Sequence, residues 1–171
     1  MFGHTLSLGY GAVGESDAAA LGEVLRVNGA LTSLDLSDSS IGAAGVAALG
    51  EALRMNNTLT SLDLSNVGLG DDGVDALVEW LHDSTGELTQ LNLCCNGFGA
   101  MGAVALGELL RSNRTIRDLC LNANCIGDVG AAVLGRALRV NNTLKALDLS
   151  SNSIADAGRA ACSRGNNGSF A

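Results

Sequence analysis

A short leucine pattern, LxxLxL, recurs along this chain at almost constant spacing. It reads LTSLDL at residues 31–36 and 59–64, LTQLNL at 88–93, IRDLCL at 116–121 and LKALDL at 144–149, with starts 28, 29, 28 and 28 residues apart. One period before Leu31 lies Gly3, where GHTLSL keeps the two closely spaced leucines. A fixed period of this length predicts an array of stacked units. The units are 3–30, 31–58, 59–87, 88–115, 116–143 and 144–171.

Each unit opens with a strand pattern. Its leucines alternate with polar residues, and a period of two indicates a short β-strand with one buried face. An apolar residue follows the last leucine by five positions, as in Ile41 and Ile126. Between them lies an asparagine in the last three units, at Asn96, Asn124 and Asn152. We expect these amides to bind the turn backbone of their own and the neighbouring unit, as a ladder along the stack.

The second half of each unit has a helix pattern. In the second unit, positions i, i+3, i+4 and i+7 of one helix face are Val46, Leu49, Gly50 and Leu53. We expect three aspartates to act as N-caps: Asp71, Asp128 and Asp156. The sixth unit is degenerate, because its helix face would consist of Arg159, Cys162, Ser163 and Asn166. The stack is therefore expected to be least ordered after residue 159.

Glycine is abundant for a reason that the repeat supplies. Of 23 glycines, fourteen recur at fixed positions that close the turn, open the helix or lie on the inner helix face. The inner-face group is Gly22, Gly50, Gly107 and Gly135. Because glycine has no side chain, we expect these four residues to let helix and sheet approach closely.

A strand–turn–helix unit of 28 residues cannot bury its apolar face alone, so stacked copies bury it against each other. With its LxxLxLxxNxI core and small-residue-rich helices, the chain resembles the leucine-rich repeat family, and the ribonuclease-inhibitor-like subtype in particular. The resemblance implies an α/β solenoid with a curved parallel sheet on the concave face and helices on the convex face. We expect one such domain over residues 1–171.

Residues between the strand leucines must point away from the core, toward the concave side of the sheet, which we call the strand face. This face is small, polar and mildly acidic, so we expect it to bind a basic protein partner. The predicted partner-binding residues are Asp35, Asp63, Asn92, Asp118, Cys120 and Asp148. The alternative is that the aspartates are scaffold residues of the repeat.

The overall charge limits the classes of partner. Ten lysines and arginines oppose eighteen aspartates and glutamates, which gives a net charge of −8. This balance argues against nucleic acid and membrane surfaces as partners, because phosphates attract a basic face. No apolar run has the length of a membrane span, and the first fourteen residues lack the features of a secretory signal. We therefore expect a cytoplasmic protein.

The cysteines suggest neither a metal site nor a disulfide. They are Cys94, Cys95, Cys120, Cys125 and Cys162, and their spacing matches no zinc motif. Cys94 and Cys120 are expected on neighbouring strands but offset by two residues, which places their Cα atoms about 8 Å apart and beyond disulfide reach. We expect reduced thiols and no bound metal or cofactor.

The family resemblance implies a non-catalytic module that binds a protein partner. Similar arrays occur in cytosolic immune receptors, in activators of the small GTPase Ran and in actin-regulating scaffolds. One alternative is therefore a GTPase-activating regulator of the Ran-activator type. Another is that the chain is a fragment of a larger cytosolic receptor or regulator, without a separate activity.

A third alternative is a dinucleotide-binding enzyme. The segment from Gly9 to Gly14, GYGAVG, matches the GxGxxG fingerprint, follows a strand pattern and precedes a helix pattern. Against it, Gly14 is the turn glycine of the repeat. In addition, Asp35 recurs as Asp63 and Asp148, although a single cofactor site needs only one acidic residue.

Three Asn-x-Thr sequons, at Asn56, Asn113 and Asn141, occupy the same turn from helix back to strand. Asparagine tolerates the left-handed backbone that often ends a helix. We therefore expect these residues to shape the turn rather than to carry glycans.

Overall fold

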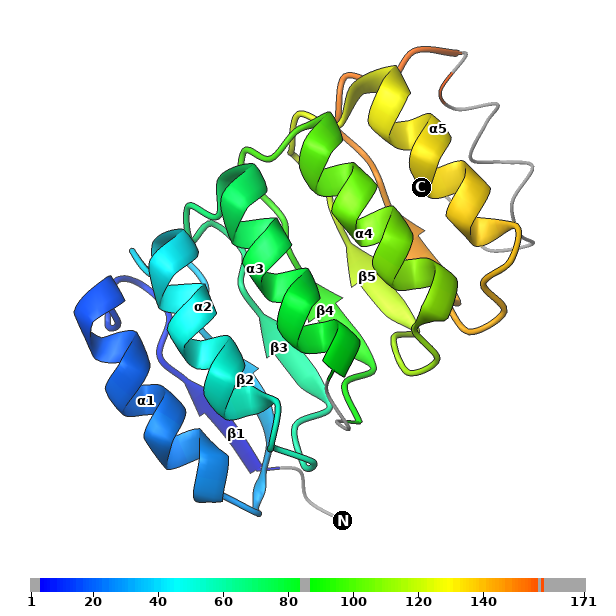
Figure 1. The fold of residues 1–171 in the computed structure, drawn as a ribbon. Coiled ribbons are helices and arrows are strands. Elements are labelled where there is room, and N and C mark those ends of the chain that lie inside the picture. The colour runs from blue at the N-terminus through cyan, green and yellow to red at the C-terminus, as the bar shows by residue number, and fades with distance from the viewer. Residues whose placement is uncertain (1–3, 84–86, 157, 159–171) are drawn as a thin grey trace.

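The computed structural model of the 171-residue chain describes residues 4–83, 87–156 and 158. Strands and helices alternate along it (Figure 1). The strands are β1 (His4–Ser7), β2 (Leu31–Asp35), β3 (Ser61–Asp63), β4 (Gln90–Asn92), β5 (Asp118–Cys120) and β6 (Ala146–Asp148). The helices are α1 (Glu15–Val27), α2 (Gly42–Leu53), α3 (Gly70–Asp83), α4 (Ala100–Ser112) and α5 (Gly127–Leu138).

The strands form one parallel sheet in which each strand pairs with the next in the sequence, from β1 to β6. The helices lie side by side over one face of this sheet (Figure 1). Each helix connects two adjacent parallel strands, so the chain advances by one strand and one helix per repeat. This arrangement confirms the predicted α/β solenoid.

The core lies between the sheet and the helices. Strand leucines such as Leu34, Leu62 and Leu91 are buried, as are the helix residues Leu49 and Leu106. The alternation of leucine with polar residues therefore has the predicted effect: one face of every strand packs against the helices, and the other is left for the strand face.

The predicted asparagine ladder is present and buried. Asn96 donates from Nδ2 to the carbonyl of Leu64 at 2.7 Å, and its Oδ1 accepts the N–H of Val67 at 3.1 Å. Asn124 donates to the carbonyl of Leu93 at 3.0 Å and accepts the N–H of Asn96 at 2.9 Å. Each amide thus satisfies backbone groups of the preceding repeat. Among the described residues, these groups make no hydrogen bond within the parallel sheet.

The aspartates at the helix starts act between repeats. Asp71 lies inside the first turn of α3, and its Oδ1 accepts the N–H groups of Gly99 and Gly102 at 2.8 and 2.7 Å, at the start of α4. Asp128 likewise accepts the N–H of Ala155 at 2.8 Å. The prediction that Asp71 and Asp128 cap their own helices is therefore wrong, because their side chains bind the free N–H groups of the following repeat.

The inner-face glycines bring helix against helix, not helix against sheet as expected. A Cβ on Gly22 would lie 3.1 Å from the Cβ of Ala52 in α2, and one on Gly107 would lie 2.8 Å from Cγ1 of Val133 in α5. Gly50 faces the indole of Trp80 in α3 in the same way. Glycine at this position therefore sets the spacing of adjacent helices.

The sequon asparagines act through their side chains and not through a left-handed backbone. The backbone of Asn113 has φ −63°, and Asn56 and Asn141 are likewise absent from the residues with positive φ. The buried Nδ2 of Asn56 donates to the carbonyl of Leu25 at 2.7 Å, and its Oδ1 accepts the N–H of Leu59 at 2.9 Å. The amide thus links the end of α1 to the residues that lead into β3, and the expected left-handed turn is wrong.

The predicted helix face of the sixth unit, with Arg159, Cys162, Ser163 and Asn166, lies outside the described residues, as does the expected loss of order after residue 159. Across residues 4–83 and 87–156, the helices are all too short or too polar to cross a membrane.

Candidate functional site

The middle column of the strand face is aligned across the sheet. Asp35 pairs in register with Asp63, Asp63 with Asn92, Asn92 with Cys120, and Cys120 with Asp148. All five side chains are partly exposed. The sixth predicted residue, Asp118, lies in a flanking column, where its neighbours in register are Gln90 and Ala146.

Each acceptor of the middle column also shapes its own turn. The Oδ1 atoms of Asp35, Asp63, Asn92 and Asp148 accept the backbone N–H two residues further along, at 3.0, 2.8, 3.1 and 2.9 Å respectively. This is the Asx-turn geometry that lets a short polar side chain replace a backbone turn bond. The column therefore has a scaffold role, and Asn92 shows that an amide fills it as well as a carboxylate.

The second oxygens join neighbouring strands. Ser7 donates from Oγ to Asp35 at 2.7 Å, and Asn92 donates from Nδ2 to Asp63 at 2.9 Å. The thiol of Cys120 lies 3.6 Å from Oδ2 of Asp148. These donors are neutral, so they orient the carboxylates without cancelling their charge.

Two of the aspartates have altered acidity. Hydrogen bonds from the side chain and backbone of Ser37, and from Ser7, hold the pKa of Asp35 below its ordinary value of 3.8. For Asp148, burial opposes ionisation, but hydrogen bonds from the backbone and side chain of Ser150 and from Cys120 together lower the pKa below 3.8. Both carboxyl groups are therefore negatively charged at neutral pH.

A shallow depression of about 320 Å³ lies on the strand face over β3 to β6. It is lined by five of the six predicted residues, namely Asp63, Asn92, Asp118, Cys120 and Asp148. Asp35 lies outside it, on β2. Among the described residues that line the depression there is no lysine or arginine. Three carboxylates thus share one concave surface without a cation among them.

The thiols of Cys94 and Cys120 meet at the edge of this surface. Their Sγ atoms are 2.6 Å apart, and both cysteines are free. The expectation that the two-residue offset puts the pair beyond disulfide reach is therefore wrong. Spacing between Cα atoms does not fix the positions of the sulfurs, because the side chains of diagonal neighbours can be directed toward one another.

The glycine-rich segment before α1 shares one turn position with the other repeats, since Tyr10 has φ 60° and the equivalent Asp38 and Asn66 have φ 55° and 54°. The carboxylate of Asp17 accepts the N–H of Gly14 at 3.0 Å, and Glu15 is a second acid in the first turn of α1. A dinucleotide-binding site needs these helix N-terminal N–H groups for a pyrophosphate. Here the carboxylate of Asp17 already binds the N–H of Gly14, and the negative charge of Glu15 lies in the same turn, so a second anion is disfavoured.

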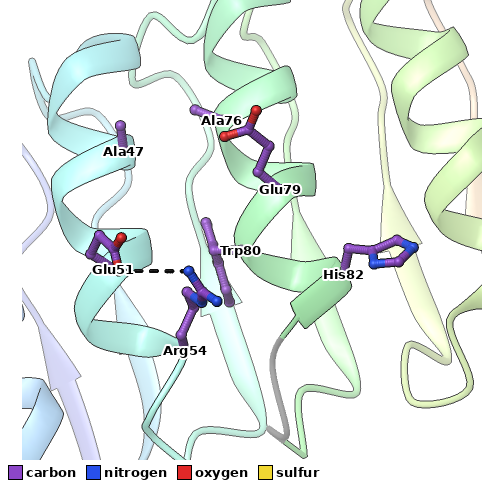
Figure 2. Close-up of a pocket in the computed structure, with 7 residues that line it drawn as sticks. All are labelled: Ala47, Glu51, Arg54, Ala76, Glu79, Trp80 and His82. Carbon is purple, nitrogen blue, oxygen red and sulfur yellow. Dashed lines mark ion pairs between the residues drawn. The ribbon is translucent and has the colours of Figure 1, made fainter.

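A second hollow, of about 560 Å³, lies on the helix side between α2 and α3 (Figure 2). Its floor is Trp80, and Glu51 and Arg54 form an ion pair at 3.8 Å beside it. The buried indole Nε1 has no hydrogen-bond partner among the described residues. Sequence reasoning missed this hollow. The available signal was a tryptophan where α2 and α5 have the alanines Ala52 and Ala137.

No grouping of three or more histidine, cysteine, aspartate or glutamate side chains in the described ranges is placed to hold a metal ion. The strand face is a row of small polar side chains with negative charge.

Comparison with known proteins supports the same fold. The match to the structure of the Caenorhabditis elegans tropomodulin C-terminal domain covers 87% of this chain and 90% of that one, with a TM-score of 0.65 and 19% identity. It also matches the structure of leiomodin-1 Actin-Binding Site 2, with a TM-score of 0.62, 20% identity and coverage of 67% of this chain and 68% of that one. No curated protein sequence gives a significant match.

The family itself is shown by sequence. A leucine-rich repeat model matches residues 30–50, 56–78, 112–135 and 140–161, which together make up more than half of the chain. These matches include the buried residues Leu34, Leu49 and Leu62, whereas Leu91 and Leu106 lie between the matched segments. The chain therefore belongs to the leucine-rich repeat family.

Proposed function

We propose that this leucine-rich repeat protein is a binding module that holds a basic segment of a protein partner on its strand face, over β3 to β6. The observation that supports the proposal is the depression in which Asp63, Asp118 and Asp148 converge without a lysine or arginine. A basic segment laid across β3 to β6 would meet three carboxylates, one each on β3, β5 and β6.

The scaffold role of the aspartates does not exclude this function. Their turn bonds come from neutral backbone N–H groups, so the negative charge remains available to a partner. The depression offers no aromatic side chain as an anchor. Because aromatic and arginine residues dominate binding hot spots, binding is expected to be guided by charge and to weaken as salt rises.

The choice of a protein partner also has support from the fold. Solenoids of this kind present an extended rigid surface that is suited to proteins. One structural neighbour is named as an actin-binding site of leiomodin-1. Actin is therefore a reasonable probe beside a generic basic peptide. The 28-residue period further supports assignment to the ribonuclease-inhibitor-like subtype.

The test compares two triple variants. Asp63→Asn, Asp118→Asn and Asp148→Asn together remove the negative charge of the depression. Since Asn92 already makes the same turn bond, the fold should be retained. Asp72→Asn, Asp75→Asn and Glu108→Gln remove the same charge from exposed positions on helices α3 and α4. Fluorescence anisotropy with a labelled lysine- and arginine-rich decapeptide, and separately with monomeric actin, gives Kd at low and moderate salt.

We expect the strand-face variant to bind the basic peptide about tenfold more weakly at low salt, with a flatter salt dependence, because three exposed charge pairs of modest strength are lost. The helix variant should bind as the parent chain does. An equal loss in both variants would show that net charge alone attracts the peptide, and would overturn the proposal. So would unchanged affinity of the strand-face variant, or a parent chain that binds neither probe.

A further inference from the structure

The sulfur atoms of Cys94 and Cys120 are closer than two unbonded sulfurs normally lie. They are 2.6 Å apart, whereas a disulfide bond is about 2.05 Å long. Cys120 ends β5, and Cys94 follows β4 by two residues. The backbone holds them there, since the N–H of Leu93 donates to the carbonyl of Cys120 at 2.9 Å and that of Cys95 to Asn122 at 3.1 Å.

We propose that Cys94 and Cys120 form a dithiol site that a low-molecular-weight disulfide, such as oxidised glutathione, converts into a disulfide between neighbouring repeats. This proposal concerns the covalent state of the chain and does not depend on the proposed function. The environment of Cys94 and Cys120 differs from that of Cys95 and Cys125, which are exposed free thiols. Cys94 and Cys120 are both partly exposed, so a small oxidant can reach them.

The chemistry proceeds by two exchange steps. The thiolate of Cys120 attacks one sulfur of oxidised glutathione, which forms a mixed disulfide and releases one glutathione. The thiol of Cys94 then loses its proton and attacks Sγ of Cys120, and the second glutathione leaves. In total the two cysteines lose two protons and two electrons, and one oxidised glutathione becomes two reduced molecules.

The surroundings of Cys94 suit it to the second step. Burial raises the pKa of the Cys94 thiol to about 12, and the hydrogen bond with Cys120 and the charge of Asp148 add to this rise. Cys94 is therefore a protonated thiol at neutral pH and a poor nucleophile toward oxidants in solution. Its position against Cys120 compensates for this once the mixed disulfide has formed, because the attack is then intramolecular. Closure is accordingly expected to be faster at alkaline pH.

Substitutions that isolate the pair have precedents in the repeat itself. Serine takes the place of Cys94 in other repeats, at Ser37, Ser65 and Ser150. The position of Cys95 has φ 57°, and Ser151 holds the equivalent position with φ 55°. A variant with Cys95→Ser, Cys125→Ser and Cys162→Ser therefore retains only Cys94 and Cys120. The matched control, with Cys94→Ser, Cys120→Ser and Cys162→Ser, retains only Cys95 and Cys125.

Both variants are incubated with oxidised glutathione, quenched with acid, and measured by intact mass and by thiol titration after unfolding. We expect the first variant to lose both thiols and the mass of two hydrogen atoms, with no glutathione attached. The control should gain the mass of glutathione on its cysteines and form no internal link. Adding Cys94→Ser to the first variant should leave Cys120 as a stable glutathione adduct.

Three outcomes would overturn the proposal. The first variant could carry glutathione on both cysteines without a link, or remain fully reduced while the control reacts. Alternatively, the control could close its own disulfide as readily as the first variant. Circular dichroism of each reduced variant shows that the fold is retained, so a failure to link cannot be assigned to unfolding.

Discussion

At the scale of single residues, a few short polar side chains do most of the work of joining repeats. Asn96 binds the backbone of Leu64 in the preceding repeat and of Cys94 in its own, and Asp71 holds the start of the next helix. The column aspartates combine a turn bond with a charge on the open surface. Replacing such an aspartate by asparagine separates the two roles, because the turn acceptor is kept and the charge is removed.

The lowered pKa values of Asp35 and Asp148 predict a dependence of stability on acid. In the unfolded chain both groups bind protons at an ordinary pKa near 3.8, and in the folded protein they bind protons only at lower pH. Their contribution to stability is therefore complete above the unfolded pKa and is lost as pH falls through the folded pKa. In urea unfolding, the parent chain should lose more stability on acidification than the variant Asp35→Asn, Asp148→Asn.

The difference between the two proteins should be confined to the acid region, from about pH 5 downward, and should be modest because both carboxylates are largely solvated. The variant Asp72→Asn, Asp75→Asn serves as the control, since it removes two exposed carboxylates from α3. Equal acid sensitivity of the parent chain and the Asp35, Asp148 variant would contradict the assigned hydrogen bonds.

At the scale of elements, the spacing of α2 and α3 depends on Gly50. A Cβ at this position would overlap Cδ1 and Cγ of Trp80, whose ring is buried between the helices. The overlap with the ring places the overpacking cost at the upper end of the usual range of about 1–3 kcal/mol, so after the roughly 1 kcal/mol that alanine gains in helix propensity, Gly50→Ala should destabilise the chain by about 1–2 kcal/mol. Gly22→Ala is the matched control, because its Cβ would lie 3.1 Å from a single methyl group of Ala52.

Chemical unfolding of both variants measures this difference. Gly22→Ala should change stability by less than Gly50→Ala, and in either direction, since propensity and crowding nearly cancel there. Adding Trp80→Leu to Gly50→Ala should recover part of the loss, because the overlapping ring is removed. A Gly50→Ala variant as stable as the parent chain would show that α2 and α3 can separate freely.

The elements also show what a repeat period can and cannot predict. Strand leucines and helix faces were predicted correctly because each follows from its place within one unit. The asparagines at 96, 124 and 152 were also predicted correctly, because they bind backbone groups that every repeat presents in the same way. The partners of Asp71 and Gly50 were not predicted, since these contacts depend on side-chain direction and on the spacing between helices. The same holds for the sulfurs of Cys94 and Cys120 and for the hollow beside Trp80. Side-chain direction and helix spacing decide these contacts, and the period fixes neither.

At the scale of the whole molecule, stability is distributed along a stack in which each repeat contacts only its neighbours. The terminal strand β1 is mostly exposed and has one neighbouring strand, whereas β3 has two. In such a nearly one-dimensional array, stability is the sum of repeat terms and interface terms. A defect in a central repeat therefore weakens two interfaces, and a defect at the end weakens one.

This distribution predicts a difference between two equivalent leucines. Leu62 on β3 is 2% exposed, and Leu6 on β1 is only partly buried. Leu62→Ala should cost about 2–5 kcal/mol of unfolding free energy, as buried leucines generally do, and Leu6→Ala should cost clearly less. Hydrogen exchange should agree: Leu62→Ala should accelerate amide exchange in β2 and β4 on either side, while Leu6→Ala should affect β1 and β2 and leave β5 unchanged. Equal costs, or acceleration of β5 by Leu6→Ala, would mean that the described repeats unfold as a single unit and not as a stack of neighbour-coupled ones.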